Sequence, residues 1–179
     1  MPRGGRVRTL VLGGARSGKS SHAESLLGDE PADYLATARR APQDQEWEAR
    51  IAAHVARRPP QWRTHEPSDL AEALRTAGRP VLVDDLGVWL TGELDDAAAW
   101  DDPAGALPRV RRRAADLVAA VQTCRTRLVL VSPEVGQGVV PETRAGRLFR
   151  DELGALNAAI AAVCDEVLLL VAGLPVRLR

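Results

Sequence analysis

Eight consecutive residues near the N-terminus have the types and spacing needed to hold phosphate groups. They match the pattern G-x-x-x-x-G-K-[ST] and are Gly13, Gly14, Ala15, Arg16, Ser17, Gly18, Lys19 and Ser20. In such a loop the glycines let backbone N–H groups turn toward phosphate oxygens, and the next helix adds the positive end of its dipole. The lysine reaches the outer phosphates, and the serine hydroxyl is a ligand for Mg²⁺. The motif predicts a binding loop for ATP or GTP, and its phosphate contacts do not choose between the two bases.

Lys19 is the only lysine in the chain, and every other basic residue is arginine. An ammonium on a slim stem is a compact point charge, whereas a guanidinium is planar and bulky. We therefore expect Lys19 to occupy a narrow loop that arginine would not fit. The alternative is a glycine-rich turn that happens to precede Lys-Ser, but the apolar run before the loop and the helical pattern after it favour phosphate binding.

Asp84 ends the apolar run Pro80–Asp84, and Asp85 follows it directly. Either aspartate could complete a Mg²⁺ site. Enzymes that transfer phosphoryl groups often hold this metal with a carboxylate at the end of a strand near the loop. Asp84 is the expected metal partner, directly or through another group, and Asp85 is the second choice. The alternative is that both residues only cap the helix that follows.

His54 lies among arginines in a pattern that is harder to explain as scaffold. On a helix, Arg50, Arg57 and Arg58 lie one turn away from it. Neighbouring cations favour the neutral, nucleophilic form of imidazole and also attract phosphates. Residue chemistry alone leaves open that this is a solvated, charged helix face. His22 and His65 have weaker surroundings and are expected to be ordinary.

Short aliphatic runs alternate with longer helical ones, which predicts an α/β sheet with helices on both faces. Expected strands are Val7–Leu12, Asp33–Thr37, Pro80–Asp84, Arg127–Ser132, Glu166–Ala172 and Val176–Leu178. Expected helices are Lys19–Leu27, Gln45–Arg57 with an Asp44 cap, Ser68–Ala77, Leu86–Ala98, Pro108–Arg125 and Glu142–Cys164. The stretch from Asp95 to Leu107 is expected to be a loop, and residues 1–179 to form a single nucleotide-binding domain.

Composition narrows the possible partners. The chain has 24 basic and 24 acidic residues and few aromatics, which disfavours nucleic acid and anionic membranes and favours a small-molecule partner. Cys124 and Cys164 have no ligand-like spacing and are expected to be reduced thiols. The apolar run near the N-terminus is too short for a signal peptide, and no run approaches the length of a membrane span, so we expect a cytoplasmic protein.

Further segments make the sequence resemble the bifunctional adenosylcobinamide kinase and adenosylcobinamide-phosphate guanylyltransferase family of cobalamin biosynthesis. The resemblance runs from about residue 10 to the C-terminus. Besides the loop, it rests on Tyr34-Leu35-Ala36-Thr37, on Arg50, Ile51, His54, Arg58, Pro59, Trp62 and Thr64, on Glu134-Val135-Gly136, Gly138, Val140-Pro141-Glu142, Arg144, Phe149-Arg150-Asp151, Asn157 and Asp165-Glu166-Val167, and on Ala172-Gly173-Leu174-Pro175.

The resemblance implies a RecA-like P-loop fold, a homotrimer and two reactions. In the first, adenosylcobinamide takes a phosphoryl group from a nucleoside triphosphate, with Lys19, Ser20, Asp84 and Mg²⁺ stabilising the charge. In the second, a histidine matching His54 takes GMP from GTP and passes it to adenosylcobinamide phosphate, giving adenosyl-GDP-cobinamide. Arg57 and Arg58 would balance phosphate charge, and Glu66 matches a position near the guanine nucleotide.

The chain departs from the family pattern where hydrogen bonds to substrate or between subunits are expected. Asp85 and Gly87 replace Cys and Thr of a Cys-Leu-Thr run, and Gly92, Pro133 and Thr143 each replace an Asn.

Two other functions fit parts of the sequence. One is a P-loop kinase for a small molecule in which His54 is structural, and the other is a RecA-like ATPase or nucleotide-binding module.

Overall fold

The computed structural model describes residues 6–38, 58–101 and 103–179. The expected helix Gln45–Arg57 and its Asp44 cap lie outside these ranges. The described strands are β1 (Arg8–Gly13), β2 (Asp33–Ala36), β3 (Arg63–His65), β4 (Val81–Asp84), β5 (Leu128–Pro133), β6 (Glu166–Val171) and β7 (Leu174–Arg177). The described helices are α1 (Lys19–Leu27), α3 (Leu70–Thr76), α4 (Leu86–Asp96), α5 (Pro103–Thr123) and α6 (Arg144–Val163).

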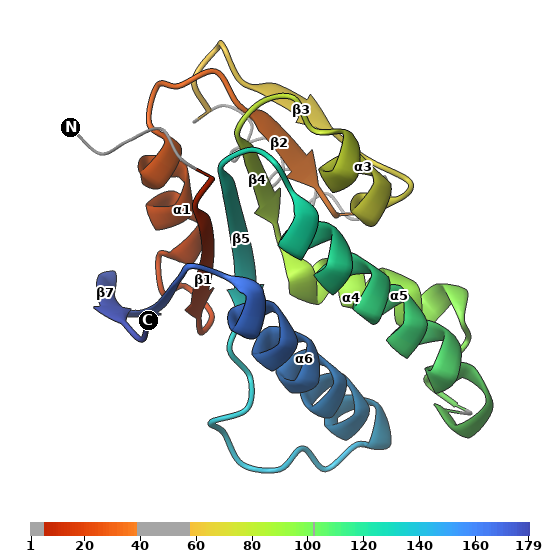
Figure 1. The fold of residues 1–179 in the computed structure, drawn as a ribbon. Helices are drawn as coiled ribbons and strands as arrows, with labels where there is room; N and C mark the ends of the chain where they lie inside the picture. The colour runs from red at the N-terminus through yellow and green to blue at the C-terminus, as the bar shows by residue number, and fades with distance from the viewer. Residues whose placement is uncertain (1–5, 39–57, 102) are drawn as a thin grey trace.

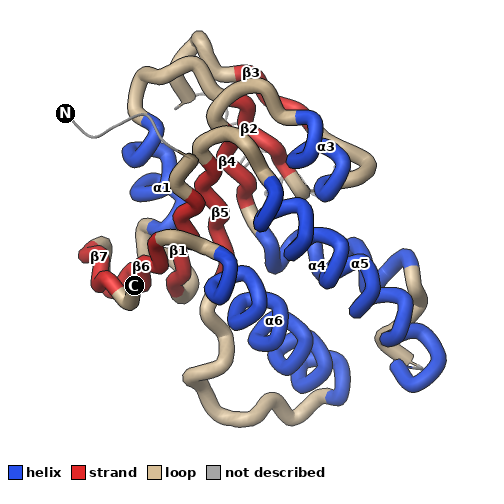
Figure 2. The backbone as a smooth tube through the Cα atoms, viewed as in Figure 1, coloured by secondary structure: helices blue, strands red, loops and turns tan. Residues whose placement is uncertain are grey.

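These strands form one sheet in the order β3-β2-β4-β5-β1-β6-β7 (Figure 2). All neighbouring pairs are parallel except β6 and β7, which form an antiparallel hairpin. The turn of this hairpin is Ala172-Gly173, and both residues have positive φ angles, as two-residue hairpin turns favour. The mostly parallel sheet and its helices confirm the predicted α/β class, and the glycine-rich loop between β1 and α1 makes the fold consistent with a P-loop NTPase.

Side chains alternate between the two faces of the sheet, and each face is covered. In β1, Leu10 and Leu12 belong to one apolar cluster and Val11 to the other. The first cluster lies under α3, α4, α5 and α6, and the second lies under α1 (Figure 1). The prediction of helices on both faces is confirmed, because strands apolar on both sides need cover on both sides.

Three expectations about the elements need correction. The strand β3 was not expected, because its three residues are polar and all exposed and give no apolar signal. The stretch from Asp95 to Leu107 is not a single loop, since α5 begins at Pro103, where a helix needs no N–H from the proline. Helix α6 begins at Arg144 rather than Glu142, because Thr143 caps it by accepting a hydrogen bond from the Gly146 N–H at 3.1 Å.

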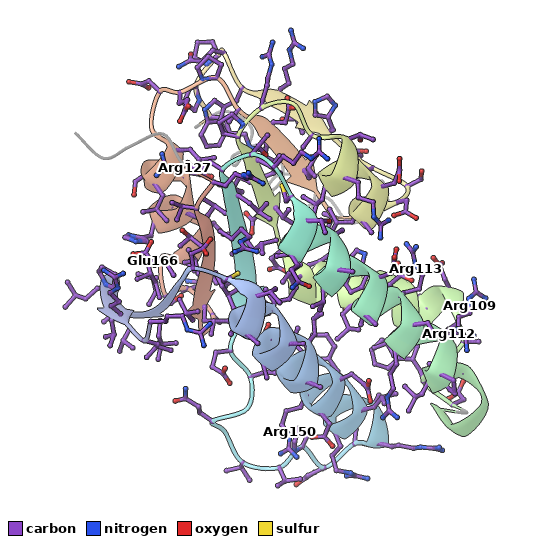
Figure 3. All side chains as sticks on the ribbon, viewed as in Figure 1. Arg109, Arg112, Arg113, Arg127, Arg150 and Glu166 are labelled. Atoms are coloured by element: carbon purple, nitrogen blue, oxygen red, sulfur yellow. The ribbon has the colours of Figure 1, made fainter. Side chains whose placement is uncertain are left out.

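An ionic contact fastens α5 to the elements beside it. Arg113, labelled in Figure 3, donates to Asp69 at the start of α3 at 2.9 Å and to Glu93 of α4 at 3.1 Å. These two carboxylates raise the pKa of Arg113 and keep it charged. The contact therefore joins three helices that cover the same face. None of the helices described here is long and apolar enough to cross a membrane.

Candidate nucleotide and metal site

The glycine-rich loop leaves β1 at Gly13 and enters α1 at Lys19. Gly18 lies just before the helix with φ of 86°, a left-handed conformation that glycine adopts at little cost. At Gly13 a Cβ atom would stand 2.3 Å from Ser17 Oγ and 3.1 Å from the Leu170 carbonyl oxygen. Both glycines are thus required by the backbone path, and this path leaves the N-terminal amides of α1 without partners inside the helix.

The loop is held from two sides. Lys19 Nζ donates to the Gly14 carbonyl at 3.4 Å, so the ammonium lies back over the loop. On the other side the Gly173 N–H, in the β6–β7 turn, donates to the Ser17 carbonyl at 3.0 Å. The hairpin therefore braces the loop, a contact between residues 156 positions apart that no local pattern reveals.

Asp84 meets the loop at its serine. Ser20 Oγ donates to Asp84 Oδ1 at 3.3 Å, and the Tyr34 hydroxyl donates to Asp84 Oδ2 at 2.7 Å. The side chain reaches this position because of strand alternation: Asp84 lies two residues after Leu82, which faces α1, whereas Val81 and Val83 face the other cluster. The structure thus brings together Ser20 and Asp84, the two residues predicted to hold the metal.

This pair of oxygen ligands suits Mg²⁺. In nucleotide enzymes the ion is usually held by one or two protein oxygens together with substrate phosphates and waters, not by a cage made of protein alone. The described residues contain no group of three His, Cys, Asp or Glu side chains that could form such a cage. A hydroxyl and a carboxylate beside a phosphate loop are the donors that Mg²⁺ prefers.

Asp85 has a different role from Asp84. Its carboxylate accepts a hydrogen bond from the Val88 N–H at 2.8 Å and caps α4, and its carbonyl accepts one from Thr37 Oγ1 at 2.7 Å. Burial raises the pKa of Asp85, and the charge of Asp84 adds to this, whereas the Val88 N–H and Lys19 oppose it. The capping alternative is thus correct for Asp85, while Asp84 faces the loop.

Tyr34 joins Asp84 to an arginine and a tryptophan, and we call Tyr34, Arg58, Trp62 and Asp84 the Tyr34 cluster. The guanidinium carbon of Arg58 lies 3.3 Å from the Tyr34 ring centroid, and Arg58 Nη1 donates to Thr64 Oγ1 at 2.8 Å. The Trp62 ring lies 6.4 Å from that of Tyr34, and both side chains are buried. Burial and the charge of Asp84 raise the pKa of Tyr34 well above its ordinary value, so the phenol remains a neutral donor. Sequence reasoning missed the role of Tyr34; the available signal was a lone tyrosine two residues before the end of a strand.

The remaining predicted site residues are His54, Arg57 and Glu66. His54 and Arg57 lie outside the described residues. Glu66, just after β3, lines a cavity of about 380 Å³ together with Thr37, Trp89 and Glu93. The lining described for this cavity comes from the end of β2 and the residues after it, from the segment after β3, from the first residue of α3 and from α4, and it includes no residue of the glycine-rich loop.

Two of the departures from the family pattern lie against each other. A Cβ atom at Gly87 would stand 2.6 Å from Pro133 Cγ, so the proline ring occupies the space that a larger residue at position 87 would need. A third departure, Thr143, caps α6. At these positions the side chains of the family pattern are therefore replaced by a packing contact and by a helix cap.

The mostly parallel sheet and the glycine-rich loop after β1 define an α/β protein consistent with the P-loop NTPase class. Residues 9–178 match the family described as cobinamide kinase / cobinamide phosphate guanyltransferase, and the chain belongs to this family.

Curated relatives agree with this assignment over nearly their whole length. The chain is 42% identical to the bifunctional adenosylcobalamin biosynthesis protein CobU of Salmonella typhimurium, covering 95% of this chain and 98% of the relative. It is 44% identical to the bifunctional adenosylcobalamin biosynthesis protein CobP of Pseudomonas aeruginosa, over 97% of this chain and 98% of the relative. A CobU of Escherichia coli is 39% identical, with 95% and 98% covered. The resemblance inferred from the motifs is confirmed, and the chain is a bifunctional enzyme of the kinase and guanylyltransferase type.

Proposed function

We propose that this chain phosphorylates adenosylcobinamide and then transfers GMP from GTP to the product, using the residues predicted from the sequence. The observation that carries the assignment of the site is the contact of Ser20 with Asp84 beside the glycine-rich loop. It supports a single metal-nucleotide site in a chain that matches the family from residue 9 to 178.

In the kinase step the hydroxyl oxygen of adenosylcobinamide forms a bond to the γ-phosphorus, the bond to the β-phosphate oxygen breaks, and the hydroxyl proton is released. The loop from Gly13 to Ser20 binds the phosphates through backbone N–H groups, and Lys19 stabilises the charge on the transferred group. Ser20 and Asp84 would hold Mg²⁺, which neutralises phosphate charge when bound. ATP and GTP both suit a loop that contacts phosphates only.

In the guanylyl step an imidazole nitrogen of His54 attacks the α-phosphorus of GTP and pyrophosphate leaves. A phosphate oxygen of adenosylcobinamide phosphate then attacks the same phosphorus, the P–N bond breaks, and adenosyl-GDP-cobinamide forms. Dividing one transfer into two is the general advantage of a covalent intermediate. Arg57 and Arg58 balance phosphate charge, and Glu66 contacts the guanine nucleotide.

Incubation with α-labelled GTP tests the covalent step. We expect acid-labile label on the wild-type protein and none on His54→Ala. His65→Ala is the matched control, because His65 lies at the end of β3 and pairs with Asp33 at 3.3 Å. Label retained by His54→Ala, or absent from the wild type, would contradict the guanylyltransferase mechanism and favour a P-loop kinase in which His54 is structural.

Substitution of the lysine tests the kinase step separately. Lys19→Arg keeps the charge but enlarges the group, so we expect loss of phosphoryl transfer from γ-labelled nucleotide to adenosylcobinamide. Arg109→Lys is the control, because Arg109 is an exposed residue of α5 outside the loop. Full activity of Lys19→Arg would show that the shape of the ammonium does not matter here. Salt-sensitive binding to single-stranded DNA would instead favour the ATPase alternative.

We also propose a homotrimer, as the family resemblance implies. Exposed apolar side chains on and beside β7 support a contact with another copy: Leu174, Val176 and Leu178 are 69%, 47% and 58% exposed. Light scattering should give about three times the chain mass of 19.2 kDa. A mass equal to one chain would contradict the proposal.

A further inference from the structure

Tyr34 lies between two groups that the proposed reactions use. Its hydroxyl donates to Asp84 Oδ2 at 2.7 Å, and one face of its ring lies against the Arg58 guanidinium, whose carbon is 3.3 Å from the ring centroid. The residue is 2% exposed and is the only tyrosine in the chain. Burying a side chain between a carboxylate and a guanidinium costs free energy, and this cost is offset only if both contacts form.

We propose that Tyr34 is a positioning residue with two arms: its hydroxyl orients Asp84 for the metal, and its ring holds Arg58 in place for the nucleotide phosphates. This inference rests on the proposed function, because it assumes that Asp84 serves Mg²⁺ and that Arg58 balances phosphate charge.

The hydroxyl arm follows from the two oxygens of Asp84. Oδ1 accepts from Ser20 and Oδ2 accepts from Tyr34, so the carboxylate is fixed at both ends. Partners of this kind around a metal ligand set its orientation, and their loss commonly weakens metal binding about 10- to 100-fold. The contact is available because Tyr34 pairs with Leu82 across β2 and β4, which puts Asp84 on the same face, one diagonal step along.

The ring arm follows from the stacking of Arg58. A guanidinium over an aromatic face is attracted by the negative charge of the π system. Thr64 accepts a hydrogen bond from Arg58 Nη1, so the arginine is held both by the ring and by this hydrogen bond. A long, flexible side chain fixed in this way loses less conformational entropy when it meets an anion.

The two arms can be separated by substitution. Tyr34→Phe removes the hydroxyl and keeps the ring, whereas Tyr34→Met removes both and fills the space with a flexible apolar chain. Arg58→Ala removes only the group that the ring holds. Calorimetric titration with GDP, with and without Mg²⁺, measures two quantities that need no turnover: GDP affinity without metal, and apparent Mg²⁺ affinity at saturating GDP.

For Tyr34→Phe we expect apparent Mg²⁺ affinity to fall about tenfold or more, with metal-free GDP affinity within about twofold of wild type. For Arg58→Ala we expect the reverse pattern, and for Tyr34→Met both losses. An apparent Mg²⁺ affinity of Tyr34→Phe within twofold of the wild-type value would overturn the hydroxyl arm. Unchanged metal-free GDP affinity in Tyr34→Met would overturn the ring arm. Unchanged metal-free GDP affinity in Arg58→Ala would also overturn it, even if Tyr34→Met does not fold.

Asp84→Asn separates failure of this inference from failure of the proposed function. If Asp84→Asn abolishes the Mg²⁺ effect while Tyr34→Phe leaves it intact, the metal site stands and Tyr34 is only a packing residue. If Asp84→Asn leaves the Mg²⁺ effect intact, the metal assignment itself is wrong and the hydroxyl arm falls with it.

Discussion

Residues 13–20 and the Tyr34 cluster meet at Asp84, but they are constructed in different ways. The loop is one continuous segment whose shape depends on two glycines and on the start of α1. The Tyr34 cluster takes its members from β2, from the segment before β3 and from the end of β4. A continuous loop carries its geometry in local sequence, whereas the cluster exists only if three separate segments pack correctly. We therefore expect them to respond differently to substitution.

The largest effect is expected from substitution of Trp62, because this side chain packs inside the Tyr34 cluster. Trp62→Ala should lower the free energy of unfolding by about 3–5 kcal/mol, because a large buried aromatic is lost. Urea unfolding monitored by circular dichroism measures this. Trp100→Ala is the matched control, since Trp100 is only partly buried and should cost less. An equal loss in both variants would show that the cluster is not specifically sensitive.

Within the loop the effect should depend on position. Gly13→Ala places a Cβ atom against Ser17 Oγ and should cost about 1–3 kcal/mol. Gly14→Ala meets no atom within 4 Å and should change unfolding free energy by no more than about 0.5 kcal/mol. Chemical denaturation of the two variants side by side tests this. Similar stabilities would mean that the loop relaxes around the new methyl group.

Asp84 and Asp85 lie where the two regions meet, and substitution of Asp85 tests whether the two aspartates have separate roles. Asp85→Ala removes the cap of α4 and should cost about 1 kcal/mol, within a range of about 0.5–2. Thr143→Ala, which removes the cap of α6, should give a similar loss and serves as the matched variant. Thermal unfolding measures both. If Asp85→Ala is neutral for stability but abolishes Mg²⁺-dependent GDP binding, the roles of the two aspartates are reversed.

A small effect is expected at Asp69, which lies outside both regions and gives a reference. Its hydrogen bond from the Glu72 N–H and its contact with Arg113 hold the pKa of Asp69 below its ordinary value. The stability gained is therefore complete above about pH 4 and is lost as the pH falls through the lower pKa of the folded state. Asp69→Asn keeps the helix cap but removes the charge. The difference from wild type should be below about 1 kcal/mol at neutral pH, because Asp69 is 42% exposed, and should shrink in acid.

Urea unfolding between pH 7 and pH 2.5 measures this difference. A constant difference across the range would contradict a contribution from the charge of Asp69.

Much of the fold could be predicted because local patterns were strong. Helix α1 begins and ends at the expected residues, and the expected strand ends lie within one residue of the observed ones except at the start of β7, which lies two residues earlier than expected. The exceptions have physical causes. The strand β3 consists of exposed polar residues that carry no periodic signal. Helix α5 starts at Pro103, five residues earlier than expected, because both Pro103 and Pro108 fit the first position of a helix and the sequence does not choose between them.

The site shows the same division. The loop and Asp84 could be selected from sequence because their types and spacing are specific to phosphate and metal binding. Asp84 was the first choice and Asp85 the second, but the sequence does not show which face of β4 lies toward α1. Alternation along β4 puts the Asp84 side chain on the face of α1 only because Leu82 is known to lie there.

The sequence by itself determined that the chain is α/β and which family it belongs to, and it predicted that phosphates bind at residues 13–20. These conclusions depend on contiguous residues or on matches along the chain, and neither needs coordinates. Only the tertiary structure decided that Tyr34 holds Asp84 and carries Arg58 on its ring, and that Gly173 braces the loop. The physical reason is that these contacts join segments far apart in the chain, and their geometry arises from the order and alternation of strands in one sheet.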